Sequence, residues 1–478
     1  MIMHVPERVY GTENEYGVLL QTANGAIDTV VDGLALLHFY HGIKAQNPPA
    51  LFTGGRAWSA NGSSTYIDSA GEHPEHATAE ARSIRDAVCC NKAGELLITG
   101  LFGSLLPDSS SLLLFKNNLG VNEDGTVEGE YGCHENYYAP RIDIARSGPI
   151  HTLIPFLISR QIMDGAGWWQ RDGTYRYSQR AMGISTDISP TTTGKRGIIT
   201  TRATKDTGLN SRLQIIMGDS NILEFAIYLK LGITSLVLSL IESGIAPVPV
   251  CRAPVIALHA ICRSCDPHAK HIRLGTGDNR SALEVQTDYF ESCRRHLRDA
   301  SFDSETTEAE SRHILVLWEQ ALHAISGNDE EWMIGRFDYA TKKYLAERHI
   351  QRKHIPPSEI QSIKKDIDIW YHQVNSRTLQ DRMNQWWPDR RIVTDEEIRT
   401  ACNEPPPDTR ARLRGRFVQL ALQGNPWNVM HSPYVDWTRI SYRRGALMHA
   451  LDFENPLMFD FKAADSFFTE LEEYIRDT

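Results

Sequence analysis

Two glutamates one residue apart, in the stretch YGTENEYGVLL at residues 10–20, raise the first chemical question. In a β-strand alternate side chains point to the same face, so Glu13 and Glu15 would lie side by side and repel each other. Such a pair needs a positive charge between its carboxylates, and a hard divalent cation is the usual partner. The stretch is therefore a candidate metal site, with a solvated edge strand as the alternative.

The stretch TYIDSAGEHPEHATAE at residues 65–80 supplies more oxygen ligands. The same alternation predicts that Tyr66 and Asp68 share one strand face, and Glu72, Glu75 and Glu80 follow in a turn-rich segment. Two neighbouring strands of this kind would line a groove with carboxylates. Divalent ions bound there could bridge the phosphate oxygens of ATP, which is a way of holding the nucleotide without a P-loop.

Three isolated residues are weaker candidates. In EYGCHENYY, at residues 130–138, a tight turn is predicted in which His134 either completes a metal shell or only stabilises the turn. Arg202 and Arg212 are candidate phosphate clamps, because a guanidinium group matches the geometry of a phosphate. Single arginines more often form surface salt bridges, so both interpretations stay open.

Composition excludes several classes of protein. The chain has 478 residues and a net charge of -10, which argues against a nucleic-acid binder. The most apolar stretch, residues 226–250, is interrupted by Lys230 and Glu242, so we expect a buried helix and not a membrane span. The first residues lack the apolar segment of a secretory signal. Eight cysteines in this context indicate reduced thiols, and we expect a cytoplasmic protein.

The elements that must hold the candidate residues are strands early in the chain and helices later. The first 80 residues alternate in a strand-like way between turns. Apolar positions recurring at three and four predict helices over 82–106, 304–325 and 330–350. Apolar runs at 111–118 and 212–221 predict buried strands whose polar ends reach a site.

Capping signals predict where two later helices begin. Ser220 or Asn221 is expected to cap the long apolar helix, with Glu224 as its capping-box partner, and Thr394 with Glu397 forms a second capping box. Three prolines at 405–407 end that second helix. We place a domain boundary there, between residues 1–400 and a small C-terminal domain of 401–478. The predicted fold class is α+β, a large, mainly antiparallel sheet packed with helices.

A series of motifs in order along nearly the whole chain resembles the family of Pup-protein ligases and the closely related Pup deamidase/depupylase. The motifs are GTENEYG, NGSSTYIDSAGEHPEHATAE, NKAGE, LFKNN, YGCHENY, PFLISRQ, SQR, GDSN, LKLG, TDEEI, PPPDTRARLRG and VDW. The resemblance implies a glutamine-synthetase-like fold with a large sheet-and-helix domain and a small C-terminal one.

The resemblance also implies roles for individual residues and for ATP and Mg2+. The positions that match the family's magnesium ligands are Glu13, Tyr66 and Glu75, beside Glu15. Asp68 matches the catalytic aspartate, and Thr78 and Trp437 match nucleotide contacts. The implied reaction phosphorylates the C-terminal glutamate of a small Pup-like modifier protein with ATP, and a lysine of a protein substrate then attacks. No nucleic acid or membrane takes part.

Most motifs favour the ligase over the hydrolase. GTENEYG is nearer to the deamidase, whereas HPEHATAE, LFKNN, YGCHEN and GDSN are nearer to the ligase. Two departures stand out: Ser64 replaces an arginine of the family, and the residues after Arg202 lack its Asp-Glu-Pro-His segment. Arg56 lies near enough in sequence to replace the lost charge. A depupylase, a small-molecule carboxylate-amine ligase and an inactive scaffold remain the alternatives.

Overall fold

The computed structural model describes residues 3–22, 24, 27–28, 33–46, 49–68, 73–103, 111–121, 127–128, 131–142, 147–201, 212–375, 378–423 and 431–476. The chain divides into two compact units. Unit 1 comprises Met1–Arg8 and Phe115–Ile392, and unit 2 comprises Val9–Leu114 and Val393–Thr478. The division between residues 1–400 and 401–478 stays a prediction.

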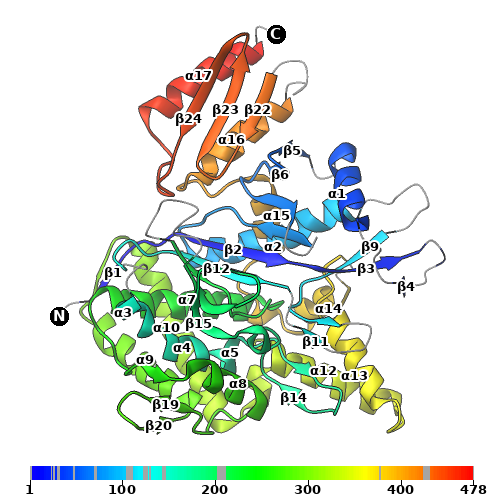
Figure 1. Ribbon diagram of the computed structural model, residues 1–478, viewed down its shortest axis with the longest axis vertical. Helices are drawn as coiled ribbons and strands as arrows, with labels where there is room; N and C mark the ends of the chain where they lie inside the picture. The colour runs from blue at the N-terminus through cyan, green and yellow to red at the C-terminus, as the bar shows by residue number, and fades with distance from the viewer. Residues whose placement is uncertain are drawn as a thin grey trace. The chain divides into compact units, whose positions relative to one another are not determined.

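Unit 2 combines a sheet from the first hundred residues with helices and a second sheet from the last eighty (blue and orange to red in Figure 1). Its elements are β2 (Tyr10–Glu15), β3 (Gly17–Gln21), β4 (Ile27–Asp28), α1 (Leu34–Ala45), β5 (Ala50–Thr53), β6 (Arg56–Ser59), β7 (Ser64–Ile67), β8 (Pro74–Ala77), α2 (Ile84–Phe102), β9 (Ser111–Phe115), α15 (Asp395–Asn403), α16 (Ala411–Gln423), β22 (His431–Val435), β23 (Arg439–Arg444), β24 (Leu447–Asp452) and α17 (Lys462–Arg476).

The first sheet of unit 2 runs in the order β2-β8-β7-β6-β5, and each neighbouring pair is antiparallel. Helix α2 packs on one face of it, where Asn91 Nδ2 donates a hydrogen bond of 2.8 Å to Thr12 Oγ1. The helix lies very close to β8 at Gly94: a Cβ atom added there would be 2.5 Å from His76 Cδ2. Glycine at this position lets the helix cover that face, and the opposite face carries the candidate site residues.

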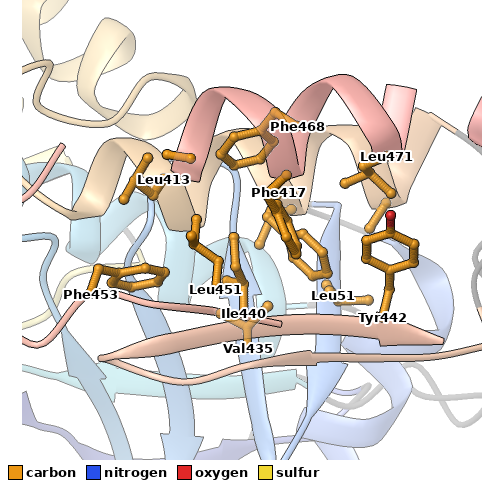
Figure 2. Packing of buried hydrophobic residues seen from close by; sticks show 14 of the residues in the cluster. Leu51, Leu413, Phe417, Val435, Ile440, Tyr442, Leu451, Phe453, Phe468 and Leu471 are labelled. Carbon is orange, nitrogen blue, oxygen red and sulfur yellow. The ribbon is translucent and has the colours of Figure 1, made fainter. Parts of the chain in front are cut away.

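The C-terminal part of unit 2 packs α16 and α17 against the sheet β22-β23-β24 around one apolar cluster. Figure 2 shows Phe417 of α16 and Phe468 of α17 facing Ile440 and Leu451 of the strands. Leu51 of β5 joins the same cluster, as does Trp58 of β6. The last residues of the chain therefore share a hydrophobic core with strands of the first sixty.

Unit 1 is mostly helical (cyan through green to yellow in Figure 1, apart from the blue β1). Its elements are β1 (His4–Val5), β10 (Gly120–Val121), β11 (Val127–Glu128), β12 (Cys133–Tyr138), α3 (Ser147–His151), α4 (Ile154–Ser159), α5 (Gln161–Asp164), β13 (Trp168–Trp169), β14 (Tyr175–Arg176), η1 (Ala181–Gly183), β15 (Thr186–Ser189), β16 (Gly197–Thr200), β17 (Arg212–Ile215), α7 (Glu224–Glu242), β18 (Cys251–Arg252), α8 (Pro254–Ser264), β19 (Ile272–Leu274), β20 (Asn279–Arg280), α9 (Ala282–Leu297), β21 (Ser301–Phe302), α10 (Glu305–Gly327), α11 (Glu330–Met333), α12 (Asp338–Lys353), α13 (Ile360–Trp370), α14 (Thr378–Trp386) and η2 (Pro388–Arg390).

Helix α7 lies at the core of unit 1, in contact with α5, α9 and α10. Its length and apolar composition would let it cross a membrane, but its most apolar window is 94% buried within the protein. The two charged side chains that interrupt it both have partners: Lys230 Nζ donates a hydrogen bond to Asp219 O at 2.8 Å, and Glu242 forms an ion pair of 2.7 Å with Arg8. The predicted buried helix is confirmed.

The predicted α+β class with a mainly antiparallel sheet is confirmed. Within the described residues, neighbouring strands such as β2 with β8, β7 with β8 and β12 with β17 are antiparallel, whereas β15 with β16 and β1 with β21 are parallel. The capping box of Thr394 and Glu397 is also confirmed. The predicted cap of α7 is wrong, because Leu223 is its N-cap. Glu224 instead accepts a hydrogen bond from the backbone N–H of Ile392 at 2.9 Å.

Two further expectations about elements are wrong. The helix predicted over 330–350 is broken into α11 and α12, and Gly335 between them has a φ of 77° that a helix does not contain. The first 80 residues are not strands alone, because α1 lies among them. Its buried residues Ala35, His38, Phe39 and Gly42 recur at three and four, but a histidine and a glycine among them weaken the apolar pattern.

Candidate active site

A row of four side chains crosses four strands of unit 2. The strand register pairs Glu15 with Glu75, Glu75 with Tyr66, and Tyr66 with Arg56. Residues that are directly opposite each other on antiparallel strands point to the same face of the sheet. The row therefore places two carboxylates, a phenol and a guanidinium group side by side. We call the face that carries it the acidic face.

Two more acids border this row. Glu13 lies two residues before Glu15 on β2, so it shares the acidic face. Asp68 directly follows β7, and its backbone N–H donates to His73 O at 2.8 Å. Carboxylate oxygens of Glu15, Asp68 and Glu75 all lie within 4.8 Å of one another. Three carboxylates so close together can hold a cation.

The electrostatics of Glu75 fit such a cation. Glu75 is 5% exposed, and burial together with the charges of Glu13, Glu15 and Asp68 raises its pKa well above the ordinary value. A hydrogen bond from Tyr66 acts in the opposite direction. The protein alone thus favours a proton on this carboxyl group, whereas a bound divalent cation would favour the carboxylate.

Tyr66 links the acids to Arg56. Burial, followed by the charges of Glu75 and Glu13, raises the pKa of Tyr66 well above its ordinary value, so the phenol is neutral. Arg56 opposes this shift by its charge and by a hydrogen bond to the phenol. The guanidinium carbon of Arg56 lies 3.6 Å from the centre of the Tyr66 ring. Both side chains are therefore held by each other.

The ligand set matches a hard divalent cation. All the donor atoms of Glu13, Glu15, Tyr66 and Glu75 are oxygens, which suit Mg2+ or Ca2+ better than the nitrogen- and sulfur-preferring transition metals. Burial, followed by the negative charges of Glu13, Glu15 and Asp68, raises the pKa of Glu75, and a bound cation would offset both effects. The residues present thus fit the ion that the sequence predicts.

Thr78 connects β2 and β8, the two strands that carry Glu13, Glu15 and Glu75. Its Oγ1 accepts a hydrogen bond of 3.0 Å from the backbone N–H of Thr12, and its own N–H donates to Thr12 O at 3.0 Å. The side chain is buried, with 5% of the residue exposed. Thr78 thereby aligns β2 with β8, the two strands that bring Glu15 opposite Glu75.

Trp437 lies between β22 and β23 in the chain and contacts β6 of the first sheet. Its ring packs edge-to-face on Trp58 of β6, with ring centres 5.0 Å apart. Trp58 pairs with Ser64 in the strand register, so it shares the acidic face with Tyr66. Tertiary packing therefore places an aromatic ring from the C-terminal residues at the end of the acidic face.

Glu80 has a different role from the one expected. The sequence placed it among the acids of the groove, but its carboxylate forms ion pairs with Arg410 and Arg414 of the C-terminal segment. These charges outweigh burial and lower the pKa of Glu80 to about 2. Arg414 also donates to Trp437 O at 3.1 Å, and its guanidinium lies 4.8 Å from that ring. Glu80 thus positions Trp437.

Sequence reasoning missed this ion-pair cluster although its signal was present. The arginines of the cluster come from the motif PPPDTRARLRG, which contains three arginines at alternate positions, Arg410, Arg412 and Arg414. A buried arginine requires a buried acid, but nothing in the linear pattern indicates which acid supplies it.

The remaining candidates belong to unit 1 by residue number, and one of them cannot be placed. Arg202 falls outside the described residues. Arg212 belongs to β17 of unit 1, where its Nε donates to Asn136 Oδ1 at 3.0 Å. The predicted turn at His134 is wrong, because Cys133–Tyr138 is the strand β12. A strand and not a turn forms there because residues 135–138 pair with β17.

Comparison with known proteins now decides the family. A family model described as "Pup-ligase protein" matches residues 8–441. A Pup--protein ligase of Acidimicrobium ferrooxidans is 34% identical over 448 residues, which cover 91% of this chain and 92% of that protein. The chain belongs to the Pup-ligase family. A further Pup--protein ligase, from Geodermatophilus obscurus, is 35% identical over 442 residues, covering 87% of this chain and 90% of that protein.

Solved structures agree with this Pup-ligase assignment. A crystal structure of the complex between the prokaryotic ubiquitin-like protein Pup and its ligase PafA has a TM-score of 0.82 and 27% identity, covering 98% of this chain and 93% of that one. A structure of the Pup ligase PafA in complex with ADP has a TM-score of 0.74 and 27% identity, covering 93% and 96%. The predicted resemblance to the Pup-ligase family is confirmed.

Proposed function

We propose that this protein is an ATP-dependent ligase that joins the side-chain carboxylate of a C-terminal glutamate, on a small Pup-like modifier protein, to lysines of substrate proteins. One observation carries the proposal. Carboxylate oxygens of Glu15, Asp68 and Glu75 lie within 4.8 Å on one sheet face, in a chain that belongs to the Pup-ligase family over most of its length.

ATP and Mg2+ are the cofactors of this proposal. Mg2+ would be held by Glu13, Glu15, Tyr66 and Glu75, whose oxygens converge on the acidic face. When bound, the ion offsets negative charge on the phosphates. Thr78 and Trp437 are the proposed nucleotide contacts of unit 2, and Arg202 and Arg212 remain the proposed phosphate clamps.

The chemistry has two steps. A carboxylate is a poor electrophile, so its oxygen first attacks the γ-phosphorus of ATP, which gives an acyl phosphate and releases ADP. A lysine amine then attacks the acyl carbon and forms the isopeptide bond as phosphate leaves. Lysine is protonated near pH 7 and must lose a proton to react. Asp68, at the edge of the acid cluster, is the proposed acceptor of that proton.

Mixing the purified protein with ATP, Mg2+, a modifier that ends in glutamate and a lysine-bearing substrate tests the proposal. We expect conjugates that mass spectrometry assigns to lysine, and none without ATP. Free modifier throughout the reaction would refute the ligase. Cleavage of a preformed conjugate without net ATP consumption would favour the depupylase instead, and coupling of a small amine only would favour a small-molecule ligase.

We also propose that the protein works in the cytoplasm. Its one helix of sufficient length and apolar composition is 94% buried among the described residues. All eight cysteines are free thiols, as expected in a reducing compartment. Fractionation of cells that produce the protein would find it in the soluble fraction, and recovery with the membranes would contradict this assignment.

A further inference from the structure

Three polar atoms on the acidic face are buried and lack a hydrogen-bond partner within the described part of the chain. They are Nη1 of Arg56, Nε1 of Trp58 and Oγ of Ser64. Trp58 and Ser64 are both 0% exposed. Buried polar atoms are usually paired, because leaving them unpaired costs folding free energy. Three such atoms in one place therefore point to a ligand that pairs them.

The strand register places the three residues next to one another. Ser64 lies directly opposite Trp58, and Arg56 lies directly opposite Tyr66, two residues further along the same pair of strands. Successive rows of the sheet are about 7 Å apart along the strands. The three atoms therefore belong to one patch between the acids and Trp437.

The same rows end in the acids that we propose hold Mg2+. One row runs from Glu15 through Glu75 and Tyr66 to Arg56, and the other starts at Glu13. In this second row Ala77 and Ser64 lie between Glu13 and Trp58. Both are small side chains, so neither reaches far above the middle of the acidic face.

The chemistry of the three atoms selects an acceptor ligand. A guanidinium nitrogen and an indole nitrogen can only donate, and a serine hydroxyl can donate as well. The positive charge of Arg56 adds a preference for an anion. Arg56 is also held in place, because its guanidinium stacks on Tyr66 at 3.6 Å. A fixed guanidinium loses little side-chain entropy on binding.

We propose that Arg56 is a phosphate-binding residue for the nucleotide, with the Ser64 hydroxyl and the Trp58 indole N–H as neighbouring donors. A polyphosphate fits because it bridges a cation at the acids and a guanidinium at the other end of the row. The inference rests on the proposed function for the identity of the nucleotide. A carboxylate of the modifier has the same acceptor chemistry, and the experiment separates the two.

The test measures binding of ADP with Mg2+, and of adenosine, by calorimetry, without any conjugation. Arg56→Gln is expected to weaken ADP binding about 10- to 100-fold, the range for loss of a charge-assisted hydrogen bond. Adenosine binding should change less than threefold, because adenosine has no phosphate. Equal ADP affinity in wild type and Arg56→Gln would overturn the inference, and so would an equal loss for adenosine.

A second substitution probes the patch itself. Ser64→Arg, added to Arg56→Gln, returns a guanidinium group from the neighbouring strand and should recover part of the lost ADP affinity. No recovery in a folded double variant would overturn the placement of Ser64 at the phosphate. If Arg56→Gln does not fold, Arg56→Lys serves in its place. It keeps the charge but loses the forked geometry, and is expected to weaken ADP binding several-fold; unchanged affinity would count against the proposal.

Controls separate this inference from its alternatives. Arg85→Gln removes an exposed arginine on α2 that pairs with Glu397, and should leave ADP affinity within twofold. If Arg56→Gln raises the KM for the modifier but leaves ADP affinity unchanged, the guanidinium binds a carboxylate and the phosphate assignment is wrong. A wild-type protein that binds ADP but forms no conjugate would refute the proposed ligase while leaving the Arg56 comparison valid.

Discussion

Replacing Glu80 with glutamine should destabilise the protein by about 3 kcal/mol at neutral pH. The carboxylate lies between Arg410 and Arg414, and its pKa falls from 4.5 to about 2. At 1.36 kcal/mol per pKa unit, this difference corresponds to about 3 kcal/mol of folding free energy. Removing one partner of a buried ion pair typically costs about 3–5 kcal/mol, which agrees with that figure.

The pH dependence of this effect has a defined sign. Because the pKa of Glu80 is lower in the folded than in the unfolded protein, its contribution is fully present above pH 4.5 and is lost as the pH falls toward 2. The stability difference between wild type and Glu80→Gln should therefore be constant from pH 5 to 8 on this basis and shrink below it. Urea unfolding followed by circular dichroism over a pH series measures it.

A matched control is the ion pair of Arg416, which lies on the same helix, α16, as Arg414. Glu472 pairs with Arg416 of α16 at 2.7 Å, but both side chains are more than 40% exposed. Glu472→Gln should cost less than about 1 kcal/mol, since solvent screens exposed pairs. Equal losses for Glu80→Gln and Glu472→Gln would refute the reasoning. So would a Glu80→Gln difference that does not change with pH.

Three other predictions concern the site and its support. Asp68→Asn should slow conjugation by about 10²–10⁴-fold, the usual range for a lost general base, with ADP affinity within threefold; conjugation at the wild-type rate would exclude Asp68 as the base. Mg2+ affinity, measured by calorimetry in the presence of ADP, should fall as the pH is lowered, because the raised pKa of Glu75 lets protons compete with the ion. Glu75→Gln should flatten that profile, and identical profiles would contradict a ligand role. Gly94→Ala should destabilise the protein by about 1–3 kcal/mol and so lower its melting temperature, because the new Cβ would lie 2.5 Å from His76 Cδ2. This clash should outweigh the preference of about 1 kcal/mol that alanine has for a helix. A higher melting temperature would contradict the close packing.

Several elements were predictable because their signals are local. The helix Glu305–Gly327 and the capping box of Thr394 depend on side chains within one or two turns of each other, which a linear pattern records. The predicted cap of α7 was wrong because the Glu224 carboxylate instead accepts a hydrogen bond from the backbone N–H of Ile392, a residue distant in sequence. The prediction of one helix over 330–350 failed because Gly335 has a positive φ, which tertiary packing determines and the apolar spacing around it does not indicate.

The candidate site divides in the same way. Alternation along a strand is enough to predict that Glu13 shares a face with Glu15, and Tyr66 with Asp68. It could not place Arg56, whose role depends on lying opposite Tyr66, nor assign Glu80 to its arginine partners. The motif series supplied the family, which the whole-chain matches then confirmed.

By itself the sequence determined which side chains share a strand face, because the backbone repeats every two residues, and which helices are amphipathic. Only the tertiary structure decided the register, which aligns Glu15, Glu75, Tyr66 and Arg56 in one row, and the packing that brings Trp437 to Trp58. Both depend on hydrogen bonds and burial between segments far apart in the chain. These contacts form only when the whole chain is folded, so the sequence pattern of a short stretch cannot predict them.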